Sequence, residues 1–138
     1  MLLLTRRERF NAAHKLYRED WSEEKNIEVF GRCANKNWHG HNYDLYVTVK
    51  GEIKEETGFI CDLKDLSQII QKKIIDVLDH RNLNLDVPFL KGKMASTEIL
   101  AVEIWNQIAT DVQSLGAELY CIKLKETENN FVEYFGPH

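Results

Sequence analysis

The spacing of hydrophobic residues along the chain predicts strands at both ends and helices between them. We expect a first strand over Leu2–Phe10 and a loop or short helix over Lys15–Gly31. Tyr43–Lys50 alternates between apolar and polar residues, as a half-buried strand does. Turn residues follow, and Phe59–Cys61 is expected to begin another strand, which would form a hairpin with Tyr43–Lys50. The apolar face of the alternating strand consists of Tyr43, Leu45, Val47 and Val49.

Two central segments repeat their apolar residues at intervals of three and four, which predicts amphipathic helices. The first helix is expected over Asp62–Leu78, with Asp62 as its N-cap. The second begins at Ser96 or Thr97 and ends at Leu115, because Gly116 stops it. The expected apolar stripes are Leu63, Leu66, Ile69, Ile70, Ile74, Val77 and Leu78 in the first helix, and Ile99, Val102, Trp105, Ile108, Ala109 and Val112 in the second.

The last part of the chain predicts a closing hairpin. Glu118–Glu126 and Phe131–Phe135 alternate on either side of the turn residues Asn129–Asn130. The whole order predicts one α+β domain over residues 1–138, an antiparallel four-stranded sheet with two helices on one face. Such a sheet has two open edges and an uncovered face, and oligomerisation is one way to protect them.

Charge and hydropathy narrow the classes of partner. The net charge is −4, and acidic and basic residues are interspersed along the chain. No Lys/Arg stripe is present, which argues against nucleic acid but still allows a small anionic ligand. No apolar run is long enough for a membrane span. The start of the chain, MLLLTRRERF, has only three leucines before its paired arginines, which is too short for the apolar region of a secretory signal. We therefore expect a cytoplasmic protein with no membrane partner.

The three cysteines are expected to have different roles. Cys33, Cys61 and Cys121 form no C-x-x-C pair, which argues against a disulfide framework and a sulfur-rich zinc site. Cys61 and Cys121 lie in apolar runs and are expected to be buried and inert. Cys33 lies among polar residues with the cations Arg32 and Lys36 nearby, surroundings that favour the reactive thiolate.

Three histidines could meet at one place. In an extended strand, residues two apart point to the same side, so His39 and His41 would share a face. His14, at the end of the first strand, could lie beside them. Three neutral histidines can form a catalytic zinc site with one open position. The spacing alone leaves the alternative open, that each is a surface histidine or a core histidine with an ordinary hydrogen-bond partner.

Two further places could carry acid–base or binding chemistry. Asp79 could orient the adjacent His80 as a general acid or base; alternatively, His80 and Arg81 complement the dipole at a helix C-terminus. Glu126 ends a strand on the same face as Tyr120, Ile122 and Leu124. A carboxylate there needs a partner if it is buried, so it could anchor a ligand with two N–H donors. The alternative is a strand end that turns into water.

The sequence resembles the 6-pyruvoyl-tetrahydropterin synthase family, which includes the bacterial 6-carboxytetrahydropterin synthases. The resemblance rests on the blocks FNAAH, RCANKNWHGHNY, VKGEIKEETGFICDLKDL, LDHRNLNLDVPF, STEILAVEIW and KETENN, which follow one another in the family order and cover essentially the whole chain. It implies the tunnelling fold, in which sheets and helices form trimers around a barrel and trimers stack into a homohexamer.

The resemblance also implies residue roles. His14, His39 and His41 would bind zinc, and Cys33 would be the catalytic base. Asp79 and His80 would complete a proton-transfer triad across a subunit interface. Glu126 would anchor the 2-amino-4-oxo edge of a pterin, and Thr97 and Glu98 would help to line the pocket.

The implied reaction is the conversion of 7,8-dihydroneopterin triphosphate to a tetrahydropterin, with elimination of triphosphate and no nicotinamide or flavin. Arg32 and Lys36 are candidates to meet the triphosphate. The product would be 6-pyruvoyl-tetrahydropterin, or 6-carboxytetrahydropterin in queuosine biosynthesis if the protein is bacterial. Cys33 lies six positions before His39, which resembles the pyruvoyl type. Trp38, however, stands where the family often has a small residue before H-G-H, so the pocket wall is expected to differ. The alternative function is a non-catalytic, zinc-stabilised pterin-binding protein of the same fold.

Overall fold

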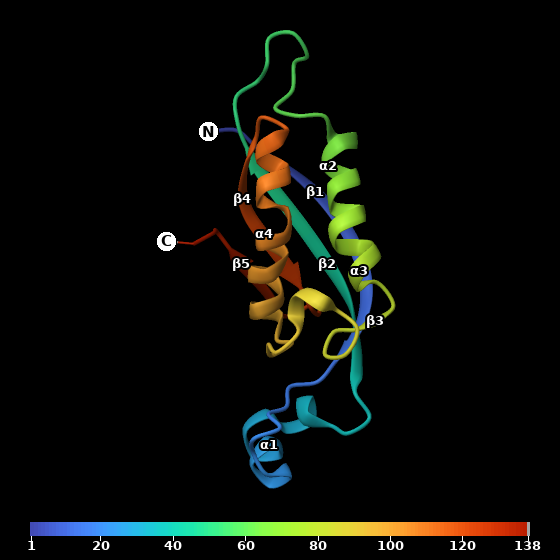
Figure 1. The fold of residues 1–138 in the computed structure, drawn as a ribbon. Helices are drawn as coiled ribbons and strands as arrows, with labels where there is room; N and C mark the ends of the chain where they lie inside the picture. Colours follow the sequence, from blue (N-terminus) through green and yellow to red (C-terminus); the bar gives the residue numbers. More distant parts are fainter. Residues whose placement is uncertain (138) are drawn as a thin grey trace.

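A long antiparallel pair of strands runs through the middle of the molecule (Figure 1). The structure is a computed structural model, and it describes residues 1–137. Strand β1 (Leu3–His14) pairs with β2 (His39–Lys50) over twelve residues, from Leu3 opposite Lys50 to His14 opposite His39. Strands β4 (Glu118–Lys125) and β5 (Phe131–Tyr134) complete the antiparallel part of the sheet.

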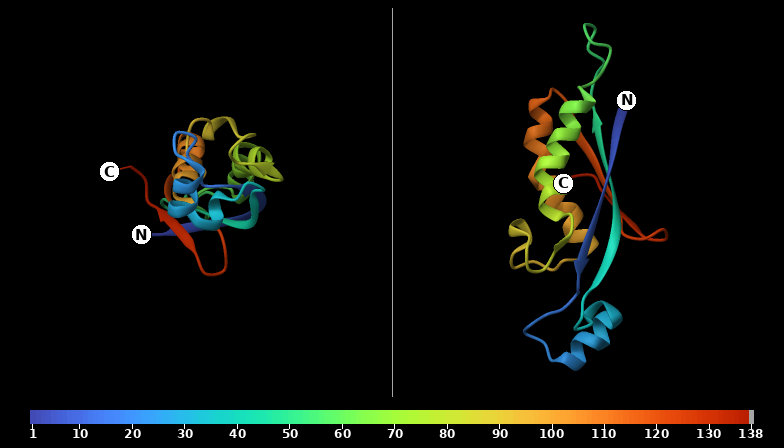
Figure 2. Two further views of the ribbon diagram at one scale, coloured as in Figure 1. Left: turned by 90° about the horizontal axis from the view of Figure 1, so that it is seen from below. Right: turned by 90° about the vertical axis from the view of Figure 1, so that its right-hand side faces the viewer.

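The predicted α+β class is confirmed, since the long helices cover one face of the sheet (Figure 2). The four principal strands are antiparallel, and the final hairpin forms where it was predicted. The strand count differs, because a two-residue strand β3 (Arg81–Asn82) pairs in parallel with β1 at Ala12 and Ala13. The sheet order is therefore β3-β1-β2-β4-β5.

The predicted hairpin between Tyr43–Lys50 and Phe59–Cys61 was wrong. Strand β2 pairs with β1 and β4, and the segment after it forms a loop that projects beyond the sheet (Figure 1). The loop closes on itself, because Lys54 N donates to Phe59 O at 3.1 Å. Ile60 and Cys61 are buried as the chain enters the next helix, so their apolar character reflects burial and not a strand.

The first predicted helix contains a change of helical type. Asp62 caps α2 (Leu63–Ile70) as predicted, and a π-helical turn (Gln71–Ile75) leads into the short α3 (Asp76–Leu78). Leu66, Ile70, Ile74 and Leu78 are fully buried at intervals of four. An α-helix of 3.6 residues per turn would rotate this spacing off the core, and one wider π turn restores it. Leu63 was wrongly included in the stripe, since it is 44% exposed.

Helix α4 (Thr97–Ser114) has the predicted length, but its core face is rotated slightly from the predicted stripe. Ser96 is the N-cap and accepts a hydrogen bond from Ile99 N. The helix ends before Gly116, whose φ of 81° suits glycine. The residues buried along α4 are Thr97, Leu100, Ala101, Ile104, Ile108 and Val112. Trp105 is only half-buried and packs edge-on against Tyr134 of β5, with ring centroids 5.5 Å apart.

The helix-facing side of the sheet forms the remainder of the core. The four apolar residues predicted for β2 are all fully buried. The pairing of β4 shifts by one residue between Thr48 and Val49, so Leu119 and Ile122 both face the core. Tyr120 was predicted on that face, but the shift turns it toward Phe135, at 5.7 Å between ring centroids. Cys61 and Cys121 are buried free cysteines, as predicted.

A small lobe lies beyond the end of the sheet where β1 ends and β2 begins (Figures 1 and 2). It contains α1 (Glu23–Phe30) and a 3₁₀ turn (Gly31–Ala34); a second 3₁₀ turn (Pro88–Leu90) precedes α4. Asn26 is fully buried and holds the lobe together, since its Oδ1 accepts from Arg18 N at 2.7 Å. Across residues 1–137, no helix has both the length and the apolar character needed to cross a bilayer.

Because Leu66 is buried and Leu63 is exposed, the two leucines should contribute differently to the free energy of unfolding. Leu66→Ala removes a fully buried side chain and should lower the free energy of unfolding by about 2–5 kcal/mol. Leu63→Ala, in the same helix, should change it by no more than about 0.5 kcal/mol. Urea denaturation at one fixed protein concentration measures both values. Equal losses of unfolding free energy would contradict the burial of Leu66 and the exposure of Leu63.

Candidate active site

Three histidine rings meet at the end of the β1–β2 pair. The register sets His14 opposite His39 and Ala12 opposite His41, so the three side chains share the helix-facing side. Ring centroids are 4.6 Å apart for His14 and His39, 5.1 Å for His14 and His41, and 4.9 Å for His39 and His41. The structure therefore brings together the three histidines predicted to bind metal.

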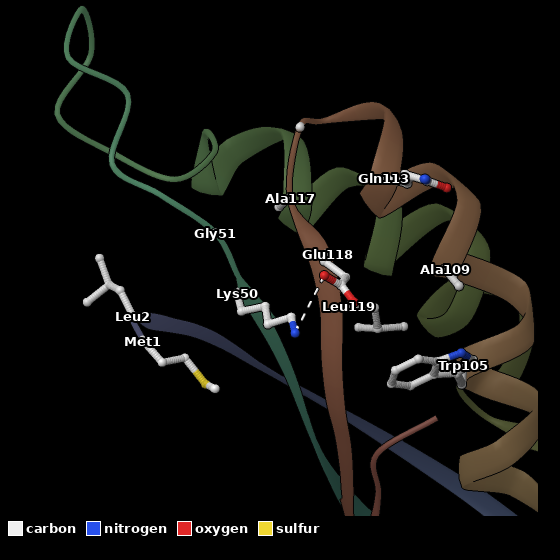
Figure 3. A pocket seen from close by; sticks show the side chains of 11 residues that line it. Met1, Leu2, Lys50, Gly51, Trp105, Ala109, Gln113, Ala117, Glu118 and Leu119 are labelled. Atoms are coloured by element: carbon white, nitrogen blue, oxygen red, sulfur yellow. Dashed lines mark ion pairs between the residues drawn. The ribbon is translucent and has the colours of Figure 1, made fainter. Parts of the chain in front are cut away.

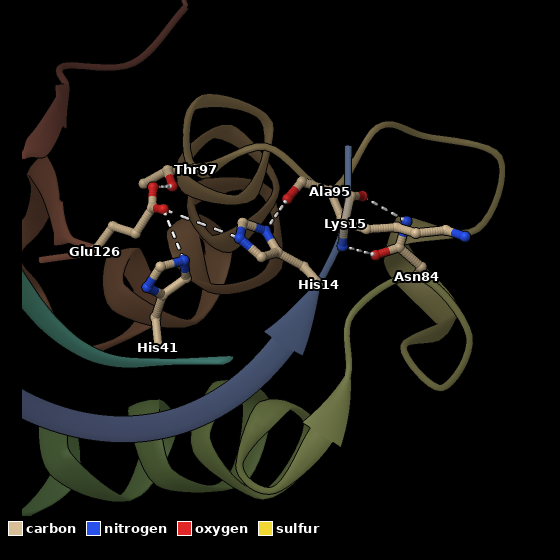
Figure 4. A network of polar contacts seen from close by, with 7 residues as sticks. All are labelled: His14, Lys15, His41, Asn84, Ala95, Thr97 and Glu126. Carbon is tan, nitrogen blue, oxygen red and sulfur yellow. Dashed lines mark hydrogen bonds and ion pairs between the residues drawn. The ribbon is translucent and has the colours of Figure 1, made fainter. Parts of the chain in front are cut away.

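Glu126, which follows β4, joins this group. Its Oε1 lies 2.9 Å from His41 Nε2 and 3.9 Å from His14 Nε2 (Figure 4). Thr97, at the start of α4, donates its hydroxyl to Glu126 Oε2. One potential ligand atom from each of the four side chains lies within 4.8 Å of the other three. We call His14, His39, His41 and Glu126 the His₃Glu cluster.

The backbone before α4 determines which nitrogen of His14 is available. His14 Nδ1 lies 2.7 Å from Ala95 O. Because a carbonyl oxygen only accepts, Nδ1 carries the proton and Nε2 keeps its lone pair. A hydrogen bond of this kind also fixes the ring orientation, as it does for histidines that bind metals.

The buried histidine nitrogens fit a metal ion. Burial lowers the pKa of His14, His39 and His41, so all three are neutral near pH 7. His14 Nε2, His39 Nδ1 and His41 Nε2 are buried without a hydrogen-bond partner; the 2.9 Å contact with Glu126 lacks the alignment of a hydrogen bond. Buried polar atoms without partners are costly, and a bound cation would satisfy them. The cluster could therefore hold a metal ion.

Cys33 lies outside the cluster, but a backbone hydrogen bond links it to the segment that follows His14. It is part of the Gly31–Ala34 turn, and its thiol is partly exposed. Cys33 O accepts from Leu16 N at 2.6 Å, which ties the cysteine turn to the segment that follows His14. Among residues 1–137 the thiol is not one of the clustered ligand atoms.

Asp79 and His80 form a pair that does not reach the cluster within this chain. Asp79 Oδ2 lies 3.1 Å from His80 Nδ1, and Asp79 Oδ1 accepts from Asn11 N at 2.8 Å. The bond from Asn11 lowers the pKa of Asp79, so the carboxylate is ionised. The side chain of His80 is 83% exposed, and over residues 1–137 no hydrogen bond or ion pair joins either residue to the His₃Glu cluster.

A small cleft lies beside the cluster on the β5 side. Its volume is about 320 Å³, and it is lined by Thr97, Glu98, Glu126, Asn130, Phe131 and Val132. The three residues that were predicted to line a substrate pocket thus share one cleft.

Comparison with known proteins agrees with this arrangement. The sequence model of the 6-pyruvoyl tetrahydropterin synthase family matches residues 3–137. The chain is 44% identical over 135 residues to 6-pyruvoyl tetrahydrobiopterin synthase of Dictyostelium discoideum, covering 98% of this chain and 96% of that protein. It is 44% identical over 133 residues to the Homo sapiens protein of that name, covering 96% and 90%. The chain belongs to the 6-pyruvoyl tetrahydropterin synthase family.

A solved structure agrees with the family assignment. The Caenorhabditis elegans 6-pyruvoyl tetrahydropterin synthase superposes with a TM-score of 0.90 at 34% identity, covering 99% of this chain and 96% of that one. The predicted family, the tunnelling fold and the carbon–oxygen lyase class are therefore confirmed.

Two groups at the site of this family member were not identified from the sequence as functional. The Tyr43 hydroxyl is buried without a partner, its ring lies 5.8 Å from that of His41, and burial raises its pKa. The sequence signal was its place two residues after His41, but we assigned it only to the core. Ala95 O has no side-chain signal at all, because a backbone carbonyl is available in any residue.

A larger cavity lies at the opposite end of the sheet. It measures about 810 Å³ and lies between the N-terminal Met1 and Leu2, the Lys50–Glu118 ion pair and Trp105 of α4 (Figure 3). His14 lies eleven positions after Leu3 in the same strand, which is roughly 35 Å of extended chain. None of the His₃Glu side chains lines this cavity, so its size does not mark the chemistry.

Metal content should depend on the histidines and not on Cys33. His14→Gln or His39→Gln should weaken metal binding by more than the roughly 10- to 100-fold that loss of an outer-shell partner costs. Cys33→Ala, the control, should bind metal as the unaltered protein does, because its thiol lies outside the cluster. Glu126→Gln should also keep the metal if three nitrogens suffice. Elemental analysis after dialysis and titration with a chelating dye measure these effects; metal loss in Cys33→Ala would contradict the assignment.

The three thiols should differ in reactivity. Burial raises the pKa of Cys61 and Cys121, so both remain protonated and slow to react at pH 8, whereas Cys33 is partly exposed. A disulfide reagent should therefore titrate one thiol per folded chain and three after denaturation. The fast thiol should disappear in Cys33→Ala, and its persistence there would show that another cysteine is accessible.

Proposed function

We propose that this enzyme converts 7,8-dihydroneopterin triphosphate to 6-pyruvoyl-tetrahydropterin with elimination of triphosphate, using Zn²⁺ bound by His14, His39 and His41. The observation that carries the proposal is the convergence of three imidazoles, each with one buried nitrogen that has no hydrogen-bond partner, in a chain 44% identical to 6-pyruvoyl tetrahydrobiopterin synthases. Neutral imidazoles in a three-histidine site are typical ligands of catalytic zinc, which keeps an open position for substrate. When bound, zinc supplies Lewis acidity that makes protons on the substrate side chain easier to remove.

Glu126 anchors the pterin ring in this proposal. A carboxylate can accept two parallel hydrogen bonds from the 2-amino and ring N–H groups of a pterin. Thr97 supports this role because its hydroxyl holds Oε2, which limits the rotation of the carboxylate. Glu98 lines the same cleft from the first turn of α4.

Cys33 is the base that removes a proton from the substrate side chain. Its turn is tied to the segment after His14, so the thiol and the metal ligands are held near one another without sharing a role. Asp79 and His80 return a proton at the site of a neighbouring subunit. Asp79 is fixed by Asn11 N, and the exposed His80 is free to reach another chain.

The enzyme acts as a homo-oligomer, a trimer or hexamer. Within residues 1–137, β3 covers β1 only at Ala12 and Ala13 on the side away from β2. From Leu3 to Phe10 that edge has no backbone partner within residues 1–137, and a long open edge favours pairing with another copy. In the proposed assembly, the pair Asp79–His80 meets the His₃Glu cluster of another subunit.

Product analysis tests the proposal directly. Zinc-loaded protein incubated with 7,8-dihydroneopterin triphosphate should release triphosphate and give a product with the mass of 6-pyruvoyl-tetrahydropterin. In Cys33→Ala, release should fall about 10²- to 10⁴-fold, the usual contribution of a general base, while zinc is retained. Cys121→Ala, which removes a buried thiol from β4, is the control and should keep turnover.

Three other outcomes are informative. A 6-carboxy product would confirm the lyase activity but assign the enzyme to the reaction of queuosine biosynthesis. Substrate that stays intact with bound zinc would favour a non-catalytic pterin-binding protein. Unreduced turnover in Cys33→Ala would assign the base to another residue.

A further inference from the structure

A cavity of about 600 Å³ lies on the side of the small lobe, where the chain leaves β1 and enters β2. Two of its lining residues adjoin proposed metal ligands in sequence, since Lys15 follows His14 and Trp38 precedes His39. The cavity walls also include Tyr17, Arg18, Glu19 and Lys93. This cavity is therefore connected, through the backbone, to the two strands that carry the cluster.

Lys15 provides this cavity with a positive charge that no carboxylate neutralises. Its ammonium lies 4.6 Å from the ring centroid of Tyr17 and 4.5 Å from that of Trp38. No carboxylate in residues 1–137 forms an ion pair with it, Glu19 included. The two other cations of the cavity are already paired, Arg18 with Asp20 at 2.6 Å and Lys93 with Glu103 at 2.7 Å. Aromatic faces stabilise a cation without consuming its charge, so Lys15 can still bind an anion.

The backbone of Lys15 is held in place from two sides. Asn84 Oδ1 accepts from Lys15 N at 3.1 Å, and Asn84 Nδ2 donates to Lys15 O at 3.0 Å. The next residue, Leu16, donates to Cys33 O. The ammonium is thus positioned before any ligand arrives, which lowers the entropy that binding would lose.

Trp38 reaches Lys15 only through an unfavourable backbone conformation. Its φ of 61° lies in the left-handed region, which bulky residues rarely adopt and which glycine adopts freely. Strain of this kind persists where the surrounding structure requires it, and it is concentrated at functional sites. Here the strained residue is the one that places an aromatic ring over Lys15.

The positions of Glu126 and Lys15 match the order of groups in the substrate. Figure 4 shows Glu126 on one side of His14, whereas the side chain of Lys15 extends to the other side. In the proposed function the pterin ring binds at Glu126 and the hydroxylated side chain at the cluster. The triphosphate at the far end of that side chain then lies toward Lys15. Arg32 and Lys36, the candidates from the sequence, are exposed and do not line this cavity.

We propose that Lys15, held between Tyr17 and Trp38, binds the triphosphate of the substrate. The proposal rests on the proposed function, since it takes its ligand from that reaction. Lys15 is a binding residue and not a proton carrier. Its loss should therefore raise KM for the triphosphate substrate by about tenfold or more, the usual loss for one charge-assisted contact, and change kcat little.

Binding of inorganic triphosphate tests Lys15 without requiring turnover. Calorimetry on zinc-loaded protein, with zinc content measured before and after, should show affinity about tenfold weaker in Lys15→Gln than in the unaltered protein. Lys15→Arg should restore it, because it keeps both the charge and the aromatic contacts. The control is Lys25→Gln: the Lys25 ammonium lies 4.2 Å from the Trp21 ring centroid but outside the cavity, so its loss should change nothing.

A second pair of variants separates the effect of the aromatic contact with Lys15 from the effect of its charge. Trp38→Gly removes the strain, so the protein should be at least as stable to heat, yet triphosphate should bind more weakly. Trp38→Phe should keep most of the affinity. Equal affinity in Lys15→Gln and the unaltered protein, or no triphosphate binding at millimolar concentration, would overturn the proposal. So would a loss of affinity in Arg32→Gln or Lys36→Gln with none in Lys15→Gln.

The proposal and the proposed function can fail separately. Protein that binds triphosphate through Lys15 but does not convert 7,8-dihydroneopterin triphosphate would retain the anion site and lose the reaction. Protein that converts the substrate with an unchanged KM in Lys15→Gln would retain the reaction and lose the anion site.

Discussion

The register between β1 and β2 is the constraint on which the site depends. Side chains alternate between the two faces of a sheet, so a slip of one residue would move His39 and His41 away from His14. Several contacts fix this register at points along both faces. Phe10 stacks on Tyr43 at 4.8 Å between ring centroids, and the hydroxyls of Thr5 and Thr48 lie 2.7 Å apart. On the outer face, Arg7 and Arg9 both contact Asp44, at 2.8 and 2.9 Å.

Helix α4 completes the site because its start is fixed against the same end of the sheet. The Ser96 cap sets the first turn of the helix, which places Ala95 O against His14 and the Thr97 hydroxyl against Glu126. The result is a set of buried nitrogens without partners inside an otherwise well-packed domain. Such groups oppose folding unless something binds them, so the cluster is a place where stability has been given up for ligand binding.

The sequence predicted those features whose cause is local. The alternation of β2, the Asp62 cap, the start of α4 at Ser96 or Thr97 and the stop at Gly116 depend on neighbouring residues, and each was predicted correctly. The π turn at Gln71–Ile75 and the shift that displaces Tyr120 depend on packing against distant elements, and both were missed. Phe59–Cys61 was misassigned because a short apolar run indicates burial and does not specify backbone conformation.

The site follows the same division between local and long-range causes. The H-x-H spacing correctly placed His39 and His41 on one face, since that depends on strand geometry alone. The contact of Ala95 O with His14 and the placement of Lys15 between Tyr17 and Trp38 join segments far apart in sequence. Residue spacing therefore does not predict them. One residue of the second feature, Trp38 directly before H-G-H, was noted in the sequence, but only as a departure from the small residue that the family resemblance implies there. Its positive φ shows why a small residue suits that position.

Strand β1 also links the two halves of the proposed chemistry. The side chain of His14 at its end belongs to the cluster, and the backbone of Asn11, three residues earlier, holds Asp79 through its N–H and His80 N through its carbonyl. This strand thus positions the proposed metal ligand His14 toward the helices and the proposed acid–base pair at the sheet edge. In an assembly that pairs such edges, a displacement of β1 would alter the cluster of one subunit together with the proton donor offered to the next. In the proposed assembly, a site divided between chains would keep its geometry because its parts are joined by backbone hydrogen bonds and not only by flexible side chains.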